Sequence, residues 1–381
     1  MLKKILSVML CFGMMMGLAS CGSSSSGSDK AYKIGVLQLI QHDSLDASYK
    51  GFVAALKENG YEDGDKIKID FQNAAGDQSN CQTISDGFVN DGKDLILAIG
   101  TPAAQAASSK TKDIPILITA VTDPADAGLV KSNEKPETNV SGTSDLTPVK
   151  DQLEVLKEFS PKAKKVGLLY SSNEANSVLQ AKIAKKEAKK LGLTIVEGTV
   201  SSSNEIQQVT SSIVDKVDAI YIPTDNTFAA GMATVALVTN EAKVPVYCGA
   251  QAMATDGGLA CYGIDYYDLG YKTGIQAIKV LEGKAKVNDM PIEYLNGDDL
   301  KLVVNNDTLK TLNMKVPDNL KRINFVKIKK HPHGLFFLLF ICQSIFYSNL
   351  FQNDTLLFLG QVSNKILLVH VPILCLHLYQ I

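Results

Sequence analysis

The sequence is short of the features that mark several large classes of protein. It contains no Trp and five His, and its formal net charge over 381 residues is −2. Because nucleic-acid-binding proteins carry clustered basic charge, this balance argues against nucleic acid as a partner. The seven Cys are scattered without a CxxC pair or a metal-ligand spacing, so no metal or cofactor is predicted. Cys248 and Cys261 flank one segment, and the sequence leaves open a disulfide between them.

Known catalytic motifs are also missing. No GxGxxG follows the first predicted strand, and the chain has neither a P-loop nor a GxSxG elbow. His42 is the only His in the part that is predicted to fold, so a Ser–His–Asp set is not available. The sequence therefore predicts a protein that is not an enzyme. An unfamiliar enzyme on a doubly wound fold stays an alternative, because a fold does not fix a function.

The N-terminus has the layout of a secretory signal. Lys3 and Lys4 precede an apolar run over residues 5–18, which is short for a membrane span. The run ends in Leu18-Ala19-Ser20-Cys21-Gly22, which resembles the lipobox of bacterial lipoproteins, where the Cys is lipidated after cleavage. We therefore expect residues 1–21 to be a lipoprotein signal and residues 22–31 a Gly/Ser tether, with lipidated Cys21 anchoring an extracytoplasmic protein to the membrane. The alternative is a plain signal peptide whose Cys is incidental.

The C-terminal part has a different composition from about Ile323 onward. It holds one acidic residue, Asp354, together with four of the five His and seven of the 13 Phe. Its apolar runs, over residues 334–347 and 365–379, are interrupted by polar residues and fall short of a membrane span. We interpret residues 322–381 as a non-native extension, such as read-through or frameshifted translation, with a functional domain as the alternative.

Between these ends, short apolar strands alternate with amphipathic helical patterns. The first half begins with a strand over residues 32–39 and a helix over residues 46–59, and the second half repeats this order from residue 148 onward. Strands that alternate with helices form right-handed βαβ units and parallel sheets. The predicted fold class is α/β, with two doubly wound parallel-sheet lobes.

Polar residues follow the predicted strands at several places. The clearest case is Asp218 to Ile222, a strand that runs into Pro223-Thr224-Asp225-Asn226. In an open parallel sheet, ligands bind beyond the carboxyl ends of the strands, so Thr224 and Asp225 are candidate ligand contacts. The alternative for this turn is a helix N-cap, since Thr, Asp and Asn are all good caps. His42 has a similar alternative as an ordinary surface residue.

Several of these turns together resemble the ABC-transporter substrate-binding family that includes the tryptophan/tyrosine/phenylalanine-binding lipoproteins. The resemblance covers about residues 32–317 and is carried by Gly100-Thr101-Pro102-Ala103, Thr122-Asp123-Pro124, Ser141-Gly142-Thr143-Ser144-Asp145, Pro223-Thr224-Asp225-Asn226 and Gly263-Ile264-Asp265-Tyr266-Tyr267-Asp268-Leu269-Gly270.

The family implies a periplasmic-binding-protein fold of the first type, with two lobes joined by three hinge strands. It implies that the helix from about Tyr267 returns to the first lobe and that the strand near Leu302 returns to the second. On this basis residues 32–146 and 262–285 are expected to form the first lobe, and residues 147–261 and 286–321 the second.

The resemblance also implies that the turns converge on one ligand between the lobes. The predicted contacts are Gln41, His42, Thr101, Ala103, Thr122, Asp123, Thr143, Asp145, Ser172, Asn173, Thr224, Asp225 and Asp265, with Gly249 and Ala250 as weaker candidates.

The predicted ligand is an amino acid, and the family favours an aromatic one. Asp225 is the first choice for its ammonium group, with Asp123 and Asp265 as rivals. The hydroxyls of Thr101 and Thr143, with N–H groups at helix starts, suit its carboxylate. Branched-chain amino acids, purine nucleosides and small peptides stay open as ligands. The implied partners are an ABC permease and its ATPase, and a binding protein that reports to a membrane receptor is the alternative.

Overall fold

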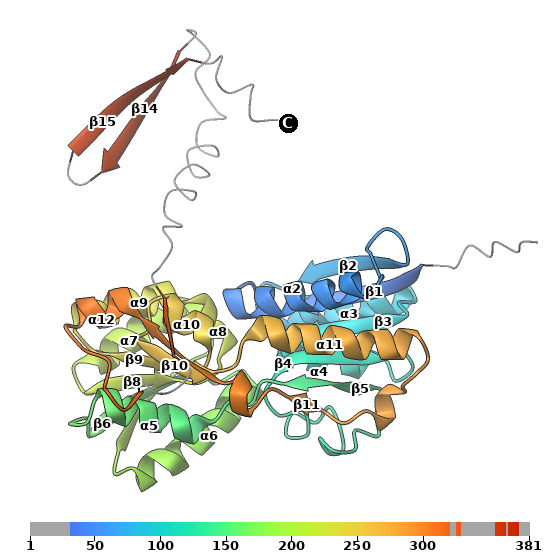
Figure 1. Ribbon diagram of the computed structural model, residues 1–381, viewed down its shortest axis with the longest axis horizontal. Helices are drawn as coiled ribbons and strands as arrows, with labels where there is room; N and C mark the ends of the chain where they lie inside the picture. The colour runs from blue at the N-terminus through green and yellow to red at the C-terminus, as the bar shows by residue number, and fades with distance from the viewer. Residues whose placement is uncertain (1–30, 321–324, 329–354, 363–364, 373–381) are drawn as a thin grey trace, which may run out of the picture. The chain divides into compact units, whose positions relative to one another are not determined.

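The computed structural model describes residues 31–320, 325–328, 355–362 and 365–372 (Figure 1). The predicted signal, Cys21 and nearly all of the predicted tether lie outside these residues. Within the described part of the chain, no helix is long and apolar enough to cross a membrane.

The first lobe is built on a six-stranded parallel sheet with the order β11-β5-β4-β3-β1-β2. Its central strands are buried at every position, as expected for apolar runs that are covered on both faces. The strands are β1 (Tyr32–Gln38), β2 (Ile67–Asn73), β3 (Leu95–Ile99), β4 (Ile116–Val121), β5 (Val140–Ser144) and β11 (Glu293–Tyr294).

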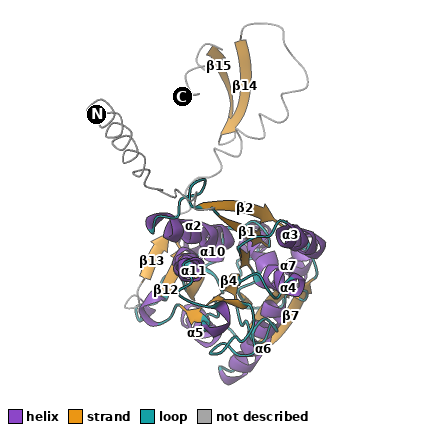
Figure 2. Ribbon diagram, turned by 90° about the vertical axis from the view of Figure 1, so that its right-hand side faces the viewer, coloured by secondary structure: helices purple, strands orange, loops and turns teal. Residues whose placement is uncertain are grey.

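Helices cover both faces of this sheet. In Figure 2, α2 (Asp43–Glu58) and α11 (Tyr266–Leu281) lie on one side of it, and α3 (Gln78–Asn90) and α4 (Thr101–Lys110) lie on the other. Helices α2 and α11 pack with their backbones in contact, because a Cβ on Gly270 would lie 1.9 Å from the Ser48 carbonyl oxygen. A Cβ on Gly51 would likewise lie 2.0 Å from the Tyr267 carbonyl oxygen. The two glycines therefore set how closely these helices approach.

The second lobe is built on a seven-stranded sheet with the order β13-β12-β10-β9-β8-β6-β7, in which β12 runs antiparallel to β10. Its strands are β6 (Lys165–Ser171), β7 (Thr194–Val200), β8 (Ala219–Ile222), β9 (Val246–Cys248), β10 (Ala260–Gly263), β12 (Lys301–Asn305) and β13 (Phe325–Ile328). Its helices are α5 (Val149–Phe159), α6 (Ala175–Lys190), η1 (Ser203–Glu205), α7 (Ile206–Val214), α8 (Asn226–Ala230), α9 (Met232–Glu241), α10 (Gln251–Thr255) and α12 (Asn306–Thr311). The short helices η2 (Val287–Asp289) and η3 (Gly297–Asp299) flank β11.

The predicted fold class is confirmed. The chain passes between the lobes after β5, after β10 and between β11 and β12, and α11 packs on α2 of the first lobe (Figure 1). Strand β12 then pairs with β10 of the second sheet. Three connections between two α/β lobes are what the family resemblance implies.

Three of the predicted boundaries differ from the pairing of the strands. Strand β10 lies in the second sheet, so the first lobe resumes after Gly263 rather than at residue 262. Strand β11 pairs with β5, which places residues 293 and 294 in the first sheet rather than the second lobe. Strand β13 pairs with β12, so residues 325–328 extend the second sheet beyond the predicted limit at residue 321. Beyond these, β14 (Thr355–Val362) and β15 (Lys365–Pro372) form an antiparallel hairpin, and the origin of the C-terminal part stays a prediction.

Cys248 and Cys261 lie directly opposite each other on β9 and β10. Both are buried and both are free thiols, so the disulfide that the sequence left open is not formed.

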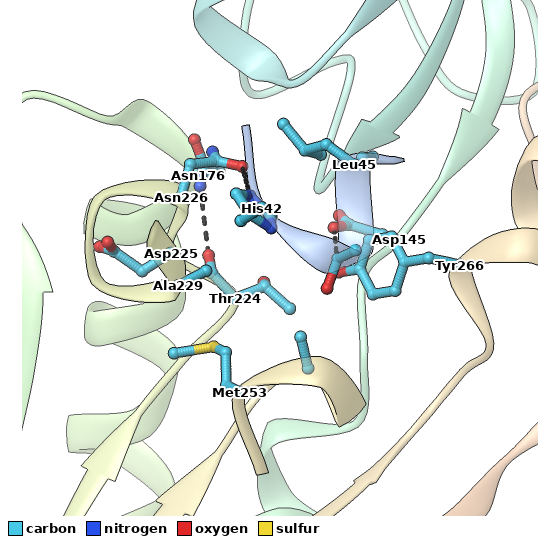
Figure 3. Close-up of a pocket in the computed structure, with 13 residues that line it drawn as sticks. His42, Leu45, Asp145, Asn176, Thr224, Asp225, Asn226, Ala229, Met253 and Tyr266 are labelled. Atoms are coloured by element: carbon cyan, nitrogen blue, oxygen red, sulfur yellow. Dashed lines mark hydrogen bonds between the residues drawn. The ribbon is translucent and has the colours of Figure 1, made fainter. Parts of the chain in front are cut away.

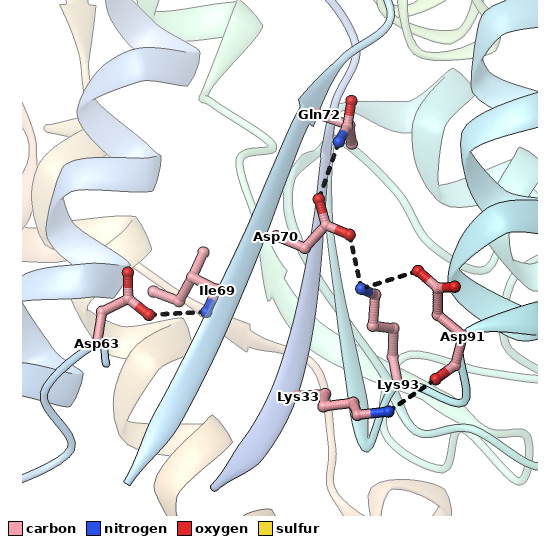
Figure 4. Close-up of polar contacts among 7 residues, drawn as sticks. All are labelled: Lys33, Asp63, Ile69, Asp70, Gln72, Asp91 and Lys93. Atoms are coloured by element: carbon pink, nitrogen blue, oxygen red, sulfur yellow. Dashed lines mark hydrogen bonds and ion pairs between the residues drawn. The ribbon is translucent and has the colours of Figure 1, made fainter. Parts of the chain in front are cut away.

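The edge of the first sheet carries a polar cluster (Figure 4). The Lys93 ammonium lies 2.6 Å from an Asp70 carboxylate oxygen and 3.3 Å from one of Asp91. Burial raises the pKa of Asp70, but the hydrogen bonds from Lys93 and Gln72 outweigh it and hold that pKa below its usual value. Because Asp70 is already paired with Lys93, we assign it a structural role in the first lobe.

Candidate ligand-binding site

A cavity, here called the inner cavity, lies between the two lobes at the carboxyl ends of their strands (Figure 3). The first lobe contributes the start of α2, the end of β4, the residue after β5 and the start of α11. The second lobe contributes the starts of α6, α8 and α10 with the turns before them. The lining residues are His42, Ser44, Leu45, Ala120, Asp145, Asn176, Thr224, Asp225, Asn226, Ala229, Ala250, Met253 and Tyr266.

One end of the inner cavity carries the carboxylate of Asp145, which is only 4 % exposed. The Tyr266 hydroxyl donates to its Oδ2 at 2.6 Å, and the Thr122 hydroxyl donates to its Oδ1 at 3.0 Å. Burial raises the pKa of Asp145, and these hydrogen bonds offset only part of that effect. Each carboxylate oxygen has a further lone pair, so Asp145 can accept more hydrogen bonds. It is a buried acid that neutral groups hold in place.

The start of α2 forms another part of the wall. His42 is the N-cap residue, its side chain makes no capping hydrogen bond, and the cavity is lined by Ser44 and Leu45 of the first turn. The first N–H groups of a helix have no partner within the helix and carry partial positive charge. The Ser44 hydroxyl is buried and has no hydrogen-bond partner either. This end of the cavity therefore offers donors suited to an anionic group.

His42 and Asn176 add two unpartnered acceptors. Asn226 turns its Oδ1 to His42 Nε2 at 3.2 Å, because its Nδ2 donates to Glu174. His42 Nε2 is then the donor, which leaves Nδ1 as an acceptor without a partner. Burial lowers the pKa of His42, and the Asn226 hydrogen bond and the Glu174 charge only partly oppose it. Asn176 Oδ1 is likewise buried and unpartnered.

Within residues 31–320, hydrogen bonds cross directly between the lobes at two places. His42 in the first lobe meets Asn226 in the second, and Gln180 Nε2 of α6 donates to the Thr122 hydroxyl at 3.3 Å. Because Thr122 also donates to Asp145, the second contact ties the closing of the lobes to the position of the buried acid.

The remaining wall of the inner cavity is apolar. It consists of Leu45, Ala229, Ala250 and Met253, with the ring of Tyr266. Ala120 adds a distorted stretch of β4, where its φ is 55° and the pairing with β5 shifts register. Such backbone is strained for a residue with a side chain and is frequent at binding sites.

Asp225, the predicted ammonium partner, has both of its oxygens occupied. Its Oδ1 accepts from the backbone N–H of Phe228 at 2.7 Å, and its Oδ2 accepts from that of Ser171 at 2.6 Å. Asp225 is thus the N-cap of α8 and also binds the end of β6. Burial and the neighbouring charge of Glu174 raise its pKa to about 7, although these backbone hydrogen bonds oppose the shift.

The other predicted contacts separate into distinct environments. Only His42, Asp145, Thr224 and Asp225 line the inner cavity, Ala250 joins them from the weaker candidates, and Thr122 holds Asp145 from behind. Thr143 is bonded to Thr119 and Thr273 within the lobe, Ala103 is buried in the core, and Thr101 is buried with an unpartnered hydroxyl.

The remaining predictions lie farther from the cavity wall. Asp123 binds the N–H groups of its own turn, Asp265 caps α11, and the Gly249 carbonyl accepts from Gln152. Gln41 and Ser172 are exposed, and Asn173 borders a second chamber that is described below.

Sequence reasoning missed Ser44, Asn176, Met253 and Tyr266 as lining residues. Ser44 and Tyr266 are first-turn residues of helices that follow strands, so the rule that pointed to the turns could have reached them one or two positions later. Asn176 lies likewise near the start of α6. Met253 is on α10, a five-residue helix that periodicity does not detect.

The sequence model of the ABC transporter substrate-binding protein family matches residues 33–327. A tyrosine-binding protein of Clostridioides difficile is 48% identical over 335 residues, which is 84% of this chain and 96% of that protein. Among solved structures, a protein from Streptococcus pneumoniae in complex with L-Trp is 43% identical with a TM-score of 0.75, covering 78% of this chain and 100% of that one. The ligand-free, open structure of a substrate-binding protein from Clostridium difficile is 49% identical with a TM-score of 0.61, covering 79% and 100%. The chain therefore belongs to the family of ABC transporter substrate-binding proteins.

Proposed function

We propose that this substrate-binding protein captures an aromatic amino acid in the inner cavity. One observation carries the proposal: Asp145 is a buried carboxylate that faces the cavity, and its side-chain partners among the described residues are the hydroxyls of Thr122 and Tyr266. A carboxylate in such a setting gains a charge-assisted hydrogen bond when an ammonium group arrives. The relatives named for tyrosine and solved with L-Trp support the choice of an aromatic ligand.

Asp145 suits the ammonium group better than Asp225 does. Both oxygens of Asp225 already accept backbone N–H groups at 2.6–2.7 Å, and displacing them would uncap α8. An ammonium has three donors, and beside Asp145 the cavity offers unpartnered acceptors at His42 Nδ1 and Asn176 Oδ1. The ligand ammonium therefore satisfies groups that are otherwise buried without partners.

The ligand carboxylate fits at the start of α2. The N–H groups of the first turn and the Ser44 hydroxyl supply donors, and the helix dipole favours negative charge at this position. A zwitterion thus finds an acid at one part of the wall and a helix start at another. The aromatic side chain then lies along Leu45, Ala229, Ala250 and Met253, where burial of apolar area contributes to affinity.

Ligand binding favours the closed arrangement of the lobes. Residues of both lobes line the inner cavity, so a ligand that contacts all of them stabilises the closed state over the open one. The direct contacts between His42 and Asn226 and between Gln180 and Thr122 require closed lobes. In agreement with this, the chain matches the L-Trp complex better than the open relative, although the open relative is the more identical in sequence.

The closed protein delivers its ligand to a membrane permease that an ATPase powers, and lipidated Cys21 keeps it at the membrane surface. The N-terminal sequence supports the lipid anchor, and membership of the family supports the permease. Transport is favoured over reporting to a receptor because the family is defined by ABC transporters.

Calorimetric titration of the purified chain tests the ligand. L-Tyr, L-Trp and L-Phe are expected to bind, while L-Leu binds more weakly and adenosine does not bind. Tyramine, which lacks the carboxylate, and 3-(4-hydroxyphenyl)propionate, which lacks the ammonium, are both expected to lose most of the affinity of L-Tyr. A nucleoside or a branched-chain amino acid that binds more tightly than all three aromatic amino acids would show that the proposed ligand is wrong.

A further inference from the structure

A second space between the lobes, here called the outer chamber, lies on the β2 and β7 side of the cleft. It encloses about 930 Å³ between atoms, including space open to solvent, whereas the inner cavity encloses about 280 Å³ on the same measure. Asn226 borders both spaces. The outer chamber is lined by Leu39, Ile40, Gly76, Asp77, Gln78, Pro102, Ser171, Asn173, Glu174, Ser201, Asn226 and Thr227.

The charge on the wall of the outer chamber is negative. Asp77 and Glu174 are acids, and none of the described residues that line the chamber is Lys, Arg or His. Glu174 is 4 % exposed, and both of its oxygens accept hydrogen bonds from neutral groups: the backbone N–H and side chain of Asn226 and of Thr227, and the side-chain amide of Asn176. Its charge is close enough to raise the pKa of Asp225, so this part of the second lobe holds acid groups in excess.

An independent feature points to a ligand in the same place. The Ser171 hydroxyl lines the outer chamber, belongs to a residue that is 1 % exposed, and has no hydrogen-bond partner. A buried hydroxyl without a partner loses the hydrogen bonds that water would give it. The backbone of Ser171 is fixed because its N–H donates to Asp225, so the hydroxyl is held in place for a partner in the chamber.

The two lobes give the outer chamber two chemically different walls. The first lobe presents apolar surface from Leu39, Ile40 and Pro102 with Asp77 at the start of α3, and the second lobe presents the hydroxyl of Ser171 and the carboxylate of Glu174. A molecule with a short alkyl part and a cationic head matches both walls at once. A carboxylate or phosphate would face two acids without a basic partner.

We propose that the outer chamber is an accessory site for a short-chain primary ammonium ion. Its head donates to the Ser171 hydroxyl beside the negative charge of Glu174, and its alkyl part lies against Leu39, Ile40 and Pro102. This goes beyond amino-acid capture, because the site is separate from the inner cavity. Since both lobes contribute, such a cation binds the closed state more tightly than the open state. It therefore increases the affinity of the inner cavity for its own ligand, and the inner ligand increases the affinity for the cation by the same factor.

Propylammonium chloride is the probe, titrated into the purified chain without any amino acid and compared with sodium chloride at equal ionic strength and with sodium acetate. We expect saturable binding of propylammonium alone. Ser171→Ala is expected to weaken that binding about fivefold, as the loss of one hydrogen bond does. Glu174→Gln is expected to weaken it more. Ser172→Ala is the matched control, because the exposed Ser172 hydroxyl donates to the Val200 carbonyl and does not line the chamber.

The result that overturns the proposal is propylammonium binding that is absent, equal in Ser171→Ala and the parent chain, or weaker than acetate binding. A second titration measures L-Tyr with saturating propylammonium. A lower Kd for L-Tyr supports the accessory site, and a higher Kd overturns it, because the two molecules would then compete for the inner cavity. Binding of propylammonium in the absence of amino acid does not depend on which amino acid the inner cavity takes, so the two proposals fail separately.

Discussion

Asp145 and Asp225 occupy corresponding places in the two lobes but have different partners. Each follows a strand of its sheet, each is buried, and each lines the inner cavity. Asp145 accepts from two side-chain hydroxyls, whereas each oxygen of Asp225 accepts from a backbone N–H group, with the Ser177 side chain as a further partner. Hydroxyls can rotate to share an acceptor with an incoming donor, but backbone N–H groups are fixed by the helix and strand that they begin or end.

The difference separates two uses of the same side chain. Asp225 completes the structure of the second lobe, as Lys93 and Asp70 complete an edge of the first. Hydroxyl groups hold Asp145 in position but do not balance its negative charge, so a cationic ligand group could do so. In a cleft with several acids, the kind of partner therefore indicates which acid binds the cation.

Replacement of Asp145 should have the largest effect on binding. Asp145→Asn removes the charge and keeps the shape, so L-Tyr affinity is expected to fall about 100-fold or more, the usual result of removing one member of a buried charge pair. The melting temperature without ligand is not expected to fall, because the buried charge has no cation partner. Asp265→Asn is the matched control, since Asn can still cap α11. An Asp145→Asn protein with the parent Kd would exclude Asp145 as the ammonium partner.

Replacement of Asp225 should act on stability first. Asp225→Ala uncaps α8 and leaves the buried N–H groups of Phe228 and Ser171 without their partner, so the free energy of unfolding is expected to fall by about 2 kcal/mol. Urea denaturation measures this change, and Asp225→Asn, which can still cap, should lose less. If Asp225→Asn kept the parent stability and lost affinity for L-Tyr as strongly as Asp145→Asn, Asp225 would be the ligand acid after all.

Asp225 also makes the stability of the protein depend on pH. The pKa of Asp225 is raised from 3.8 to about 7, so the folded chain holds a proton that the unfolded chain releases. The stability that the protonated group contributes is present at low pH and is lost as the pH rises through about 7. Asn at this position does not titrate, so the difference in stability between Asp225→Asn and the parent chain should shift in favour of the variant as the pH rises from about 4 to about 7. Urea denaturation of both proteins at several pH values measures the trend, and a flat or opposite trend contradicts it.

The fold was predictable because central strands such as β3, β4 and β8 are fully buried apolar runs and alternate with helices. The ends of β8 and β5 were located closely enough to bring Thr224, Asp225 and Asp145 to the inner cavity. Thr143 does not line the inner cavity because it lies one residue inside β5, where the alternation of side chains turns it to Thr273 on α11.

The roles of the acids could not be predicted from the sequence. A Thr-Asp-Asn turn is a good helix cap and a good ligand site for the same reason, namely short polar side chains beside a helix start. Only the positions of Phe228 and Ser171 decide that Asp225 is used as a cap. The hydrogen bond from Tyr266 to Asp145 joins residues 121 positions apart in the sequence, so no local sequence pattern predicts it.

The glycine contact between α2 and α11 has a consequence for how a ligand is selected. With the two backbones in contact at Gly51 and Gly270, the helix starts that carry Ser44 and Tyr266 are held in a fixed position relative to each other. The first lobe thus presents its half of the binding site already assembled before the lobes close. A solute that binds there needs to order few side chains. Selectivity between similar solutes then depends on the side chains that the second lobe adds on closing, above all Met253 and Asn176.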